Sequence, residues 1–170
     1  MMAAPSGPRA KIDRLGTKLC LLWAGLSIGV AFLATPAKFL APSLSLPVAL
    51  DVGRQTFRVY NGVEFVLLGS LLVLGGWSSL RARWYLGLVA PGAVVIAQAL
   101  WLIPALDLRV AAIQAGQSPL PPSNLHGAYI LAEAIKILWL LAMGLGEISS
   151  GRGRAPRLGH RARQRGQIQT

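Results

Sequence analysis

Titratable side chains recur on one face of an apolar segment in the last third of the sequence. The segment LHGAYILAEAIKILWLLAMG, residues 125–144, carries His126, Tyr129, Glu133 and Lys136. At about 100° per residue these side chains fall within about 80° of arc on a helix. Ionisable groups inside a membrane helix are costly. They mark an ion path, a proton relay or a bound polar ligand, or they hold helices together by hydrogen bonds.

Two other apolar segments carry a polar residue at the same depth. Glu64, Gln98 and Glu133 each lie six or seven residues from the same end of their segments, which corresponds to roughly 10 Å. Lys136 lies about one turn deeper. We therefore predict an intramembrane polar layer of Glu64, Gln98, Glu133 and Lys136. Its two carboxylates exceed its one ammonium group, which favours proton or cation binding, although a purely structural network is the alternative.

The composition identifies the class of protein that must position this layer. Hydrophobic residues make up 54% of the 170 residues, charged residues only 14%, and the mean hydropathy is +0.53. Soluble domains carry nearer a quarter charged residues. Four windows reach the roughly 20 apolar residues that a membrane span needs: residues 19–40, 57–77, 84–104 and 127–146. We predict an all-α, polytopic membrane four-helix bundle.

The regions outside the spans are polar and basic. We expect residues 1–18 to be a disordered basic N-terminus, 19–146 to form the transmembrane domain, and 147–170 to be a disordered Arg-rich tail. The first span could instead be a signal peptide cleaved near Ala37. An uncleaved span is favoured because its apolar core is slightly long for a signal peptide.

The distribution of basic residues predicts the orientation in the membrane. Positive charge accumulates on the cytoplasmic side. Placing both termini there collects twelve basic residues on that side and leaves four on the other, namely Lys38, Arg54, Arg58 and Arg109. The sequence therefore predicts a multi-pass protein of the plasma (inner) membrane with both termini cytoplasmic.

Several polar residues are expected at the outer interface, where the spans meet the outer loops. These are Arg58, Asn61, Asp107, Arg109 and His126. Asp107 and Arg109 are expected to pair with Arg58 or with Asp51 of the facing loop. Asp51 is also a candidate cap for the helix that enters the second span, and Gly116 is a candidate C-cap for the helix that continues past Pro104.

The Arg-rich tail and the few remaining motifs limit the partners and cofactors. The tail suits anionic lipid head groups at the cytoplasmic face. It lacks aromatic residues for base stacking, which disfavours nucleic acid. We expect no cofactor and no metal site, because the histidines and the single cysteine are too few for one. A haem could take only one axial ligand inside the membrane, His126. No serine has a positioned base, so an enzyme is not favoured.

Four stretches also resemble a known family in their order and spacing. FLATPAKFLAP, VGRQTFRVYNGVE, QALWLIPALDLRVAAIQAG and LHGAYILAEAIKI are similar to those of a domain-of-unknown-function family of small four-span membrane proteins, which is also related to an animal transmembrane protein. The resemblance covers residues 19–146. It implies the four-span fold and no particular activity.

Three classes of function remain open on the sequence. The first is a small proton- or cation-coupled transporter or channel component that uses the polar layer. The second is a non-catalytic assembly or scaffold subunit of a larger membrane complex. The third is a haem- or quinone-linked membrane oxidoreductase. Four spans enclose little space, so transport would be expected to involve a homo-oligomer.

Overall fold

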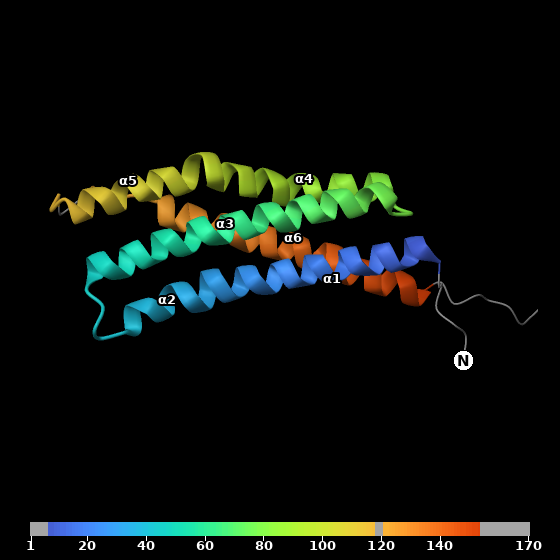
Figure 1. Cartoon of the computed structure of the whole chain (residues 1–170), viewed down its shortest axis with the longest axis horizontal. Coiled ribbons are helices and arrows are strands. Elements are labelled where there is room, and N and C mark those ends of the chain that lie inside the picture. The colour runs from blue at the N-terminus through green and yellow to red at the C-terminus, as the bar shows by residue number, and fades with distance from the viewer. Residues whose placement is uncertain (1–6, 118–120, 154–170) are drawn as a thin grey trace, which may run out of the picture.

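The computed structural model describes residues 7–117 and 121–153, with side chains up to residue 146, as long helices lying side by side (Figure 1). Four helical stretches are long and apolar enough to cross a membrane: Pro8–Leu40, Leu46–Trp77, Arg81–Gln114 and Leu125–Gly146. The described residues contain no strand. The predicted all-α fold, with four helical stretches long and apolar enough to cross a membrane, is therefore confirmed.

Short irregular turns interrupt two of the four stretches. The elements in chain order are α1 (Pro8–Ile28), the π-helical turn η1 (Gly29–Ala34), α2 (Thr35–Ala37), the 3₁₀ turn η2 (Lys38–Leu40), α3 (Leu46–Trp77), α4 (Arg81–Ala97), the π-helical turn η3 (Gln98–Leu102), α5 (Ile103–Gln114) and α6 (Leu125–Gly153).

The helices extend beyond the predicted boundaries. α1 begins at Pro8, so the expectation of disorder through residue 18 is wrong for residues 8–18. α3 begins at Leu46 and α6 continues to Gly153, so the tail predicted to be disordered is helical over residues 147–153. A hydropathy window measures the length needed in hydrocarbon, whereas a helix continues into water wherever its backbone bonds are satisfied. The rest of the tail, residues 154–170, lies outside the described residues.

Of the two predicted helix-capping residues, one prediction is wrong and the other is confirmed. Asp51 lies inside α3, where its Oδ1 accepts a hydrogen bond of 2.6 Å from Arg54 Nη2, so its predicted capping role is wrong. Gly116 has a φ of 78°, and the N–H of Gln117 donates to the carbonyl of Ala112 at 3.0 Å. Glycine adopts this left-handed conformation without steric cost. The predicted helix end at Gly116 is therefore confirmed.

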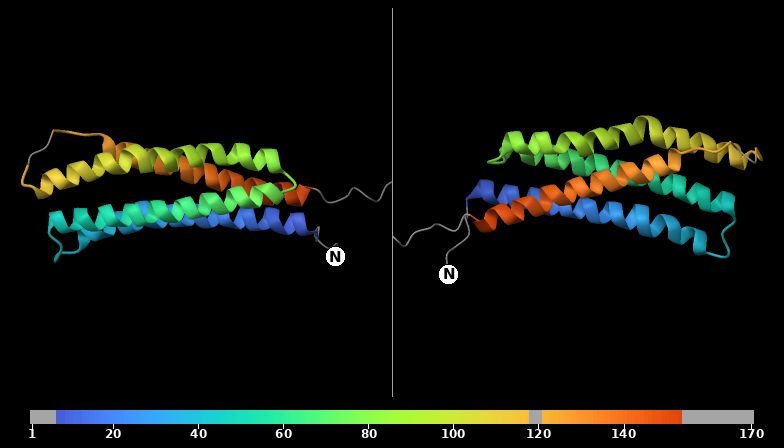
Figure 2. Two further views of the ribbon diagram at one scale, coloured as in Figure 1. Left: turned by 45° about the horizontal axis from the view of Figure 1, so that its top comes forward. Right: turned by 180° about the vertical axis from the view of Figure 1, so that it is seen from behind.

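The helices pack in a ring, so that two pairs lie on diagonals. α1 packs against α3 and α6, and α4 also packs against α3 and α6, which leaves α3 and α6 facing each other across the bundle (Figure 2). Both described chain ends lie at the same end of the bundle as the turn between α3 and α4 (Figures 1 and 2). We call this the proximal end, and the opposite end the distal end.

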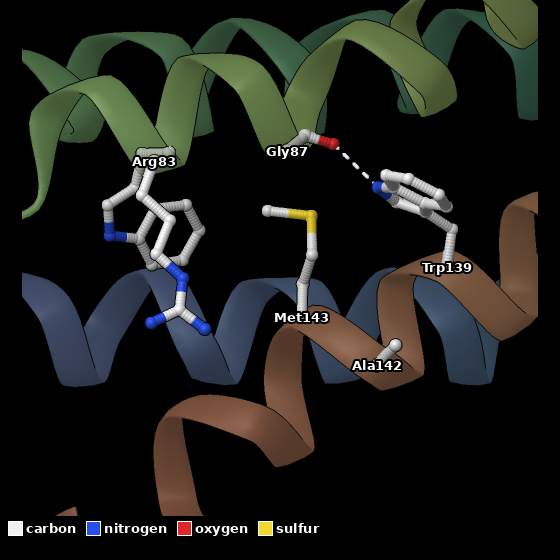
Figure 3. A pocket seen from close by; sticks show the side chains of 6 residues that line it. Arg83, Gly87, Trp139, Ala142 and Met143 are labelled. Atoms are coloured by element: carbon white, nitrogen blue, oxygen red, sulfur yellow. Dashed lines mark hydrogen bonds between the residues drawn. The ribbon is translucent and has the colours of Figure 1, made fainter. Parts of the chain in front are cut away.

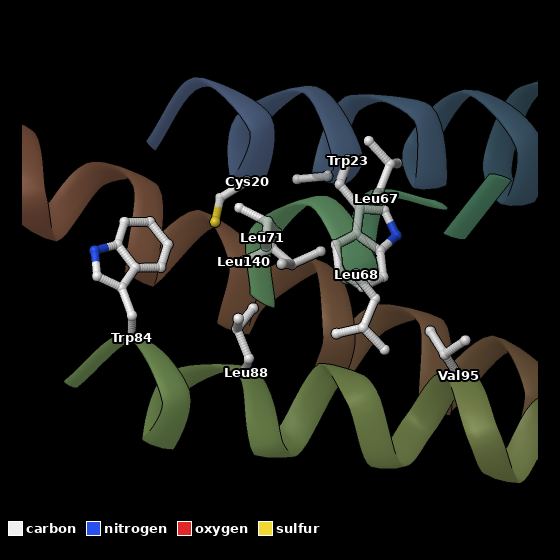
Figure 4. Close-up of a cluster of buried hydrophobic side chains, with 10 residues drawn as sticks. Cys20, Trp23, Leu67, Leu68, Leu71, Trp84, Leu88, Val95 and Leu140 are labelled. Atoms are coloured by element: carbon white, nitrogen blue, oxygen red, sulfur yellow. The ribbon is translucent and has the colours of Figure 1, made fainter. Parts of the chain in front are cut away.

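Two apolar clusters fill the interior at different heights. The proximal cluster (Figure 4) contains Cys20, Trp23, Ala24, Leu67, Leu68, Leu71, Trp84, Leu88, Val95 and Leu140. The distal cluster contains Leu102, Ile103 and Tyr129, with Phe57, Leu106, Leu125 and Ala128 packed against it. From the distal to the proximal end, α6 carries Tyr129 of the distal cluster, Glu133 and Lys136 of the polar layer, and Leu140 of the proximal cluster. The same order of distal cluster, polar layer and proximal cluster holds along the other helices of the bundle that contribute to all three. The polar layer therefore lies between the proximal and the distal apolar cluster.

Prolines account for both π-helical turns. Proline lacks an N–H, and its ring clashes with the carbonyl four residues earlier. For Pro36 and Pro104 those carbonyls belong to Phe32 and Leu100, which lie within η1 and η3. A wider turn relieves the clash, and such turns are frequent at functional sites. Gln98, a polar-layer residue, is the first residue of η3.

A third proline, Pro91, lies inside α4 and frees the carbonyl of Gly87. The indole N–H of Trp139 on α6 donates to this carbonyl at 2.8 Å (Figure 3). Met143 lies beside Gly87, where a Cβ would meet its Cε at 2.6 Å. The missing helical hydrogen bond is thus replaced by one between helices, at a place where the Met143 side chain packs against Gly87.

Candidate functional site

Lys136 is the centre of the polar layer. Its ammonium group donates to Glu64 Oε1, to Glu133 Oε1 at 2.8 Å and to Gln98 Oε1 at 3.2 Å. Lys136 is 1% exposed and both glutamates are fully buried. An ammonium group has three protons to donate, and each one has an acceptor here. The structure therefore brings together the four residues of the predicted layer, with Lys136 in ion pairs with both carboxylates.

Gln98 bridges the two charged species. Its side-chain oxygen faces Lys136, and its Nε2 donates to Glu133 Oε1 at 2.9 Å. Glu133 Oε1 therefore accepts two hydrogen bonds, one from Gln98 and one from Lys136. Because Gln98 begins a π-helical turn, the direction of its side chain depends on the local geometry that Pro104 imposes.

The first helix contributes a residue that the sequence did not indicate. Trp23 of α1 is fully buried, and its indole N–H donates to Glu64 Oε1 at 3.0 Å. With Glu64 on α3, Gln98 on η3 and Lys136 on α6, all four spans contribute to one network. Tryptophan in an apolar span usually faces lipid or the interface, so its type alone did not mark it. Its spacing of four from Ser27, on the same helix face, was the available signal.

A hydrogen bond between Ser27 and Tyr60 lies on the distal side of the layer. Ser27 Oγ and the hydroxyl of Tyr60 are 2.5 Å apart, and both residues are buried. The ammonium group of Lys136 lies 5.7 Å from the centroid of the Tyr60 ring, within the range of a cation–π contact. Tyr60 thus covers the layer on the side of the distal cluster.

The two carboxylates are only half satisfied. Glu64 Oε2 and Glu133 Oε2 are buried and have no hydrogen-bond partner. Three ionisable groups, two acidic and one basic, leave the layer with one excess negative charge. Burying unpaired carboxylate oxygens costs several kcal/mol in general. This arrangement is therefore expected to be stabilised by one further positive charge at these oxygens.

The predicted outer-interface residues lie at the distal end but do not form one site. Arg58 forms an ion pair with Asp107, linking α3 to α5, as expected. Arg109 donates to the carbonyl of Pro121 at 2.9 Å and holds the loop before α6, so its expected pairing with Asp51 is wrong. Asn61 is 7% exposed, and its Nδ2 has no partner. His126 and Asp107 both line a cavity between α2, η2, α3, α5 and the start of α6.

Comparison with known proteins identifies no relative of this chain. No family model matches the chain, and searches of curated proteins and of solved structures also find no match. The resemblance to a family of small four-span membrane proteins therefore stays a prediction, and function has to be argued from the site.

Proposed function

We propose that this chain is a small proton-coupled membrane transport protein, a carrier or channel component, whose layer of Glu64, Glu133 and Lys136 binds and releases one proton. One observation carries the proposal: two fully buried carboxylates share a single ammonium group, and one oxygen of each has no partner. A structural ion pair does not need the second carboxylate. A protonation site does, because a proton added to either carboxylate brings the layer to electrical neutrality.

The packing favours a proton over a metal cation. Three well-formed cavities among the described residues include no residue of the polar layer in their linings. A metal cation requires room and several oxygen ligands, whereas a proton needs only a lone pair. Ionisable groups at this depth mark proton relays in pumps and transporters.

Proton release requires a path from the polar layer to solvent, and the two apolar clusters block this path. η3 is the element best suited to open it, because its wider turn ends beside Pro104 and carries Gln98. A shift of this turn would withdraw the Gln98 amide from Glu133 and alter the exposure of that carboxylate. We propose further that the proximal end faces the cytoplasm in the plasma (inner) membrane, since twelve basic residues cluster on that side in the sequence.

Proton uptake into proteoliposomes tests this proposal. The full-length protein is reconstituted with a pH-sensitive dye inside, and a membrane potential is imposed with potassium and valinomycin. We expect uptake well above that of empty liposomes, and a loss of at least ten-fold for Glu133→Gln and Glu64→Gln. Asp51→Asn is the matched control, because this carboxylate is 44% exposed and lies outside the layer.

A second measurement detects the proton itself. Infrared difference spectra between acid and alkaline buffer are expected to show the carbonyl stretch of a buried carboxylic acid, which Glu133→Gln or Glu64→Gln removes. If the wild-type protein gives neither proton uptake nor this band, the layer is a structural network and the proposal is wrong.

A further inference from the structure

A second site lies at the distal end, away from the polar layer. A partly open cavity of about 90 Å³ lies between α2, η2, α3, α5 and the start of α6. Its apolar wall includes Phe57, Ile103 and Leu106, and its basic side chains are Lys38, Arg54 and His126. Phe57 packs against Tyr129, with ring centroids 4.6 Å apart, so an aromatic pair separates this cavity from the layer below it.

Lys38 supplies a positive charge that no carboxylate offsets. Its ammonium group lies 5.0 Å from the Phe39 ring centroid and 5.7 Å from that of Phe57. In the described part of the chain, no carboxylate lies within 4.0 Å of it. The one acidic residue of the cavity, Asp107, is already paired with Arg58. The cavity therefore contains one uncompensated cation.

Arg54 adds an unused hydrogen-bond donor. Its Nη2 pairs with Asp51 at 2.6 Å, while its Nε is buried and has no partner. Buried donors without acceptors are rare in folded proteins and call for an explanation. A ligand oxygen in the cavity would provide the acceptor.

Glycine at position 53 lets Lys38 reach the cavity. A Cβ at Gly53 would lie 1.8 Å from Lys38 Nζ, so any side chain there displaces the ammonium group. Gly53 is buried on the face of α3 that meets η2. Helical glycine costs about 1 kcal/mol relative to alanine, and at this position it makes room for the charge.

We propose that this cavity binds a small organic monocarboxylate, with its carboxylate between Lys38 and Arg54 and its apolar part against Phe57 and Ile103. One uncompensated cation matches one negative charge, and hydrogen bonds between charged partners are about twice as strong as neutral ones. The cavity has a volume of about 90 Å³ and is partly open, so a short-chain acid can place its carboxylate and first carbons inside it. The site stands on its own contacts and does not depend on proton transport.

Butyrate is the probe for this site. Binding to the full-length protein in a non-ionic detergent is measured by titration calorimetry, beside butyramide and butylammonium. We expect saturable butyrate binding and at least ten-fold weaker binding of the other two, because they lack the negative charge. Equal binding of butyramide would contradict the proposal, since an apolar cavity alone would explain it.

Matched variants separate the charge from the fold. Lys38→Gln and Gly53→Ala are each expected to weaken butyrate binding at least ten-fold, the first by removing the cation and the second by displacing it. Lys18→Gln removes an exposed lysine at the proximal end, and Gly62→Ala adds a methyl group to α3 where nothing lies within 4 Å. Both controls should bind like wild type. Unchanged binding by Lys38→Gln and Gly53→Ala would overturn the assignment.

The same titration keeps this proposal apart from the proposed function. Glu133→Gln should bind butyrate like wild type even where proton uptake is lost, because Glu133 lies outside the cavity lining. Failure of butyrate to bind a protein that still takes up protons would reject only the carboxylate site.

Discussion

Lys136 on α6 and Glu64 on α3 form a buried ion pair across the diagonal of the helix ring, between helices that are not packing neighbours. The long lysine side chain spans the interior and reaches carboxylates on two helices. A third helix contributes Gln98 and the fourth contributes Trp23 through Glu64. All four long helical stretches therefore contribute to one network, in which Lys136 pairs with Glu64 and Trp23 donates to Glu64.

The single variant Lys136→Met should destabilise the bundle more than the double variant that also carries Glu133→Gln. Lys136→Met leaves two buried carboxylates uncompensated, a change that typically costs about 3–5 kcal/mol. Adding Glu133→Gln should recover part of that loss. Thermal unfolding in detergent measures both effects. If the single variant melts like wild type, or the two effects simply add, the charges are not coupled as the structure has them.

Trp23 should matter through its N–H. Trp23→Phe keeps an aromatic ring in the proximal cluster but removes the donor to Glu64 Oε1. Loss of a hydrogen bond to a buried charged group is expected to cost about 1–3 kcal/mol, seen as a lower melting temperature. Trp101→Phe is the control, because Trp101 is 61% exposed. Equal melting temperatures for the two variants would indicate that the indole N–H contributes nothing.

The hydrogen bond between Trp139 and Gly87 should depend on Pro91. Trp139→Phe leaves the Gly87 carbonyl without a donor, and a cost of about 1 kcal/mol is expected. Pro91→Ala restores a backbone N–H that can bond to the same carbonyl within α4. Trp139→Phe should then cost less in the Pro91→Ala background. A double-mutant cycle of unfolding free energies measures this coupling, and strict additivity would contradict it.

The orientation can be tested with single cysteines. Cys20 is fully buried, and replacing it with alanine gives a cysteine-free background. Gln117→Cys at the distal end is expected to react with a membrane-impermeant maleimide in intact cells. Ser79→Cys, in the turn between α3 and α4, should react only after permeabilisation. The reverse pattern would place the proximal end outside and contradict the orientation inferred from the basic residues.

The height of the polar layer could be predicted from the sequence, but its full membership could not. Counting residues from the ends of the spans placed Glu64, Gln98 and Glu133 at one level, because the helical rise per residue is constant. Trp23 escaped prediction because an indole in an apolar span looks the same whether it faces lipid or the interior. The helix ends at Pro8, Leu46 and Gly153 were not predicted either. Hydropathy indicates the length of chain that suits the hydrocarbon of a bilayer, and it does not indicate where the backbone hydrogen bonds of a helix end.

The sequence by itself determined that the chain has four segments long and apolar enough to span a membrane and that Lys136 needs a carboxylate partner. Both results follow from local quantities, the apolar length needed in a bilayer and the cost of an unpaired charge inside it. Only the tertiary structure decided that α3 lies diagonally opposite α6, that all four long helical stretches contribute to one hydrogen-bond network around Lys136 and Glu64, and that Lys38 lies against Gly53 beside an apolar cavity. These features depend on which helices are neighbours and how each is rotated, and packing among all the spans sets both at once.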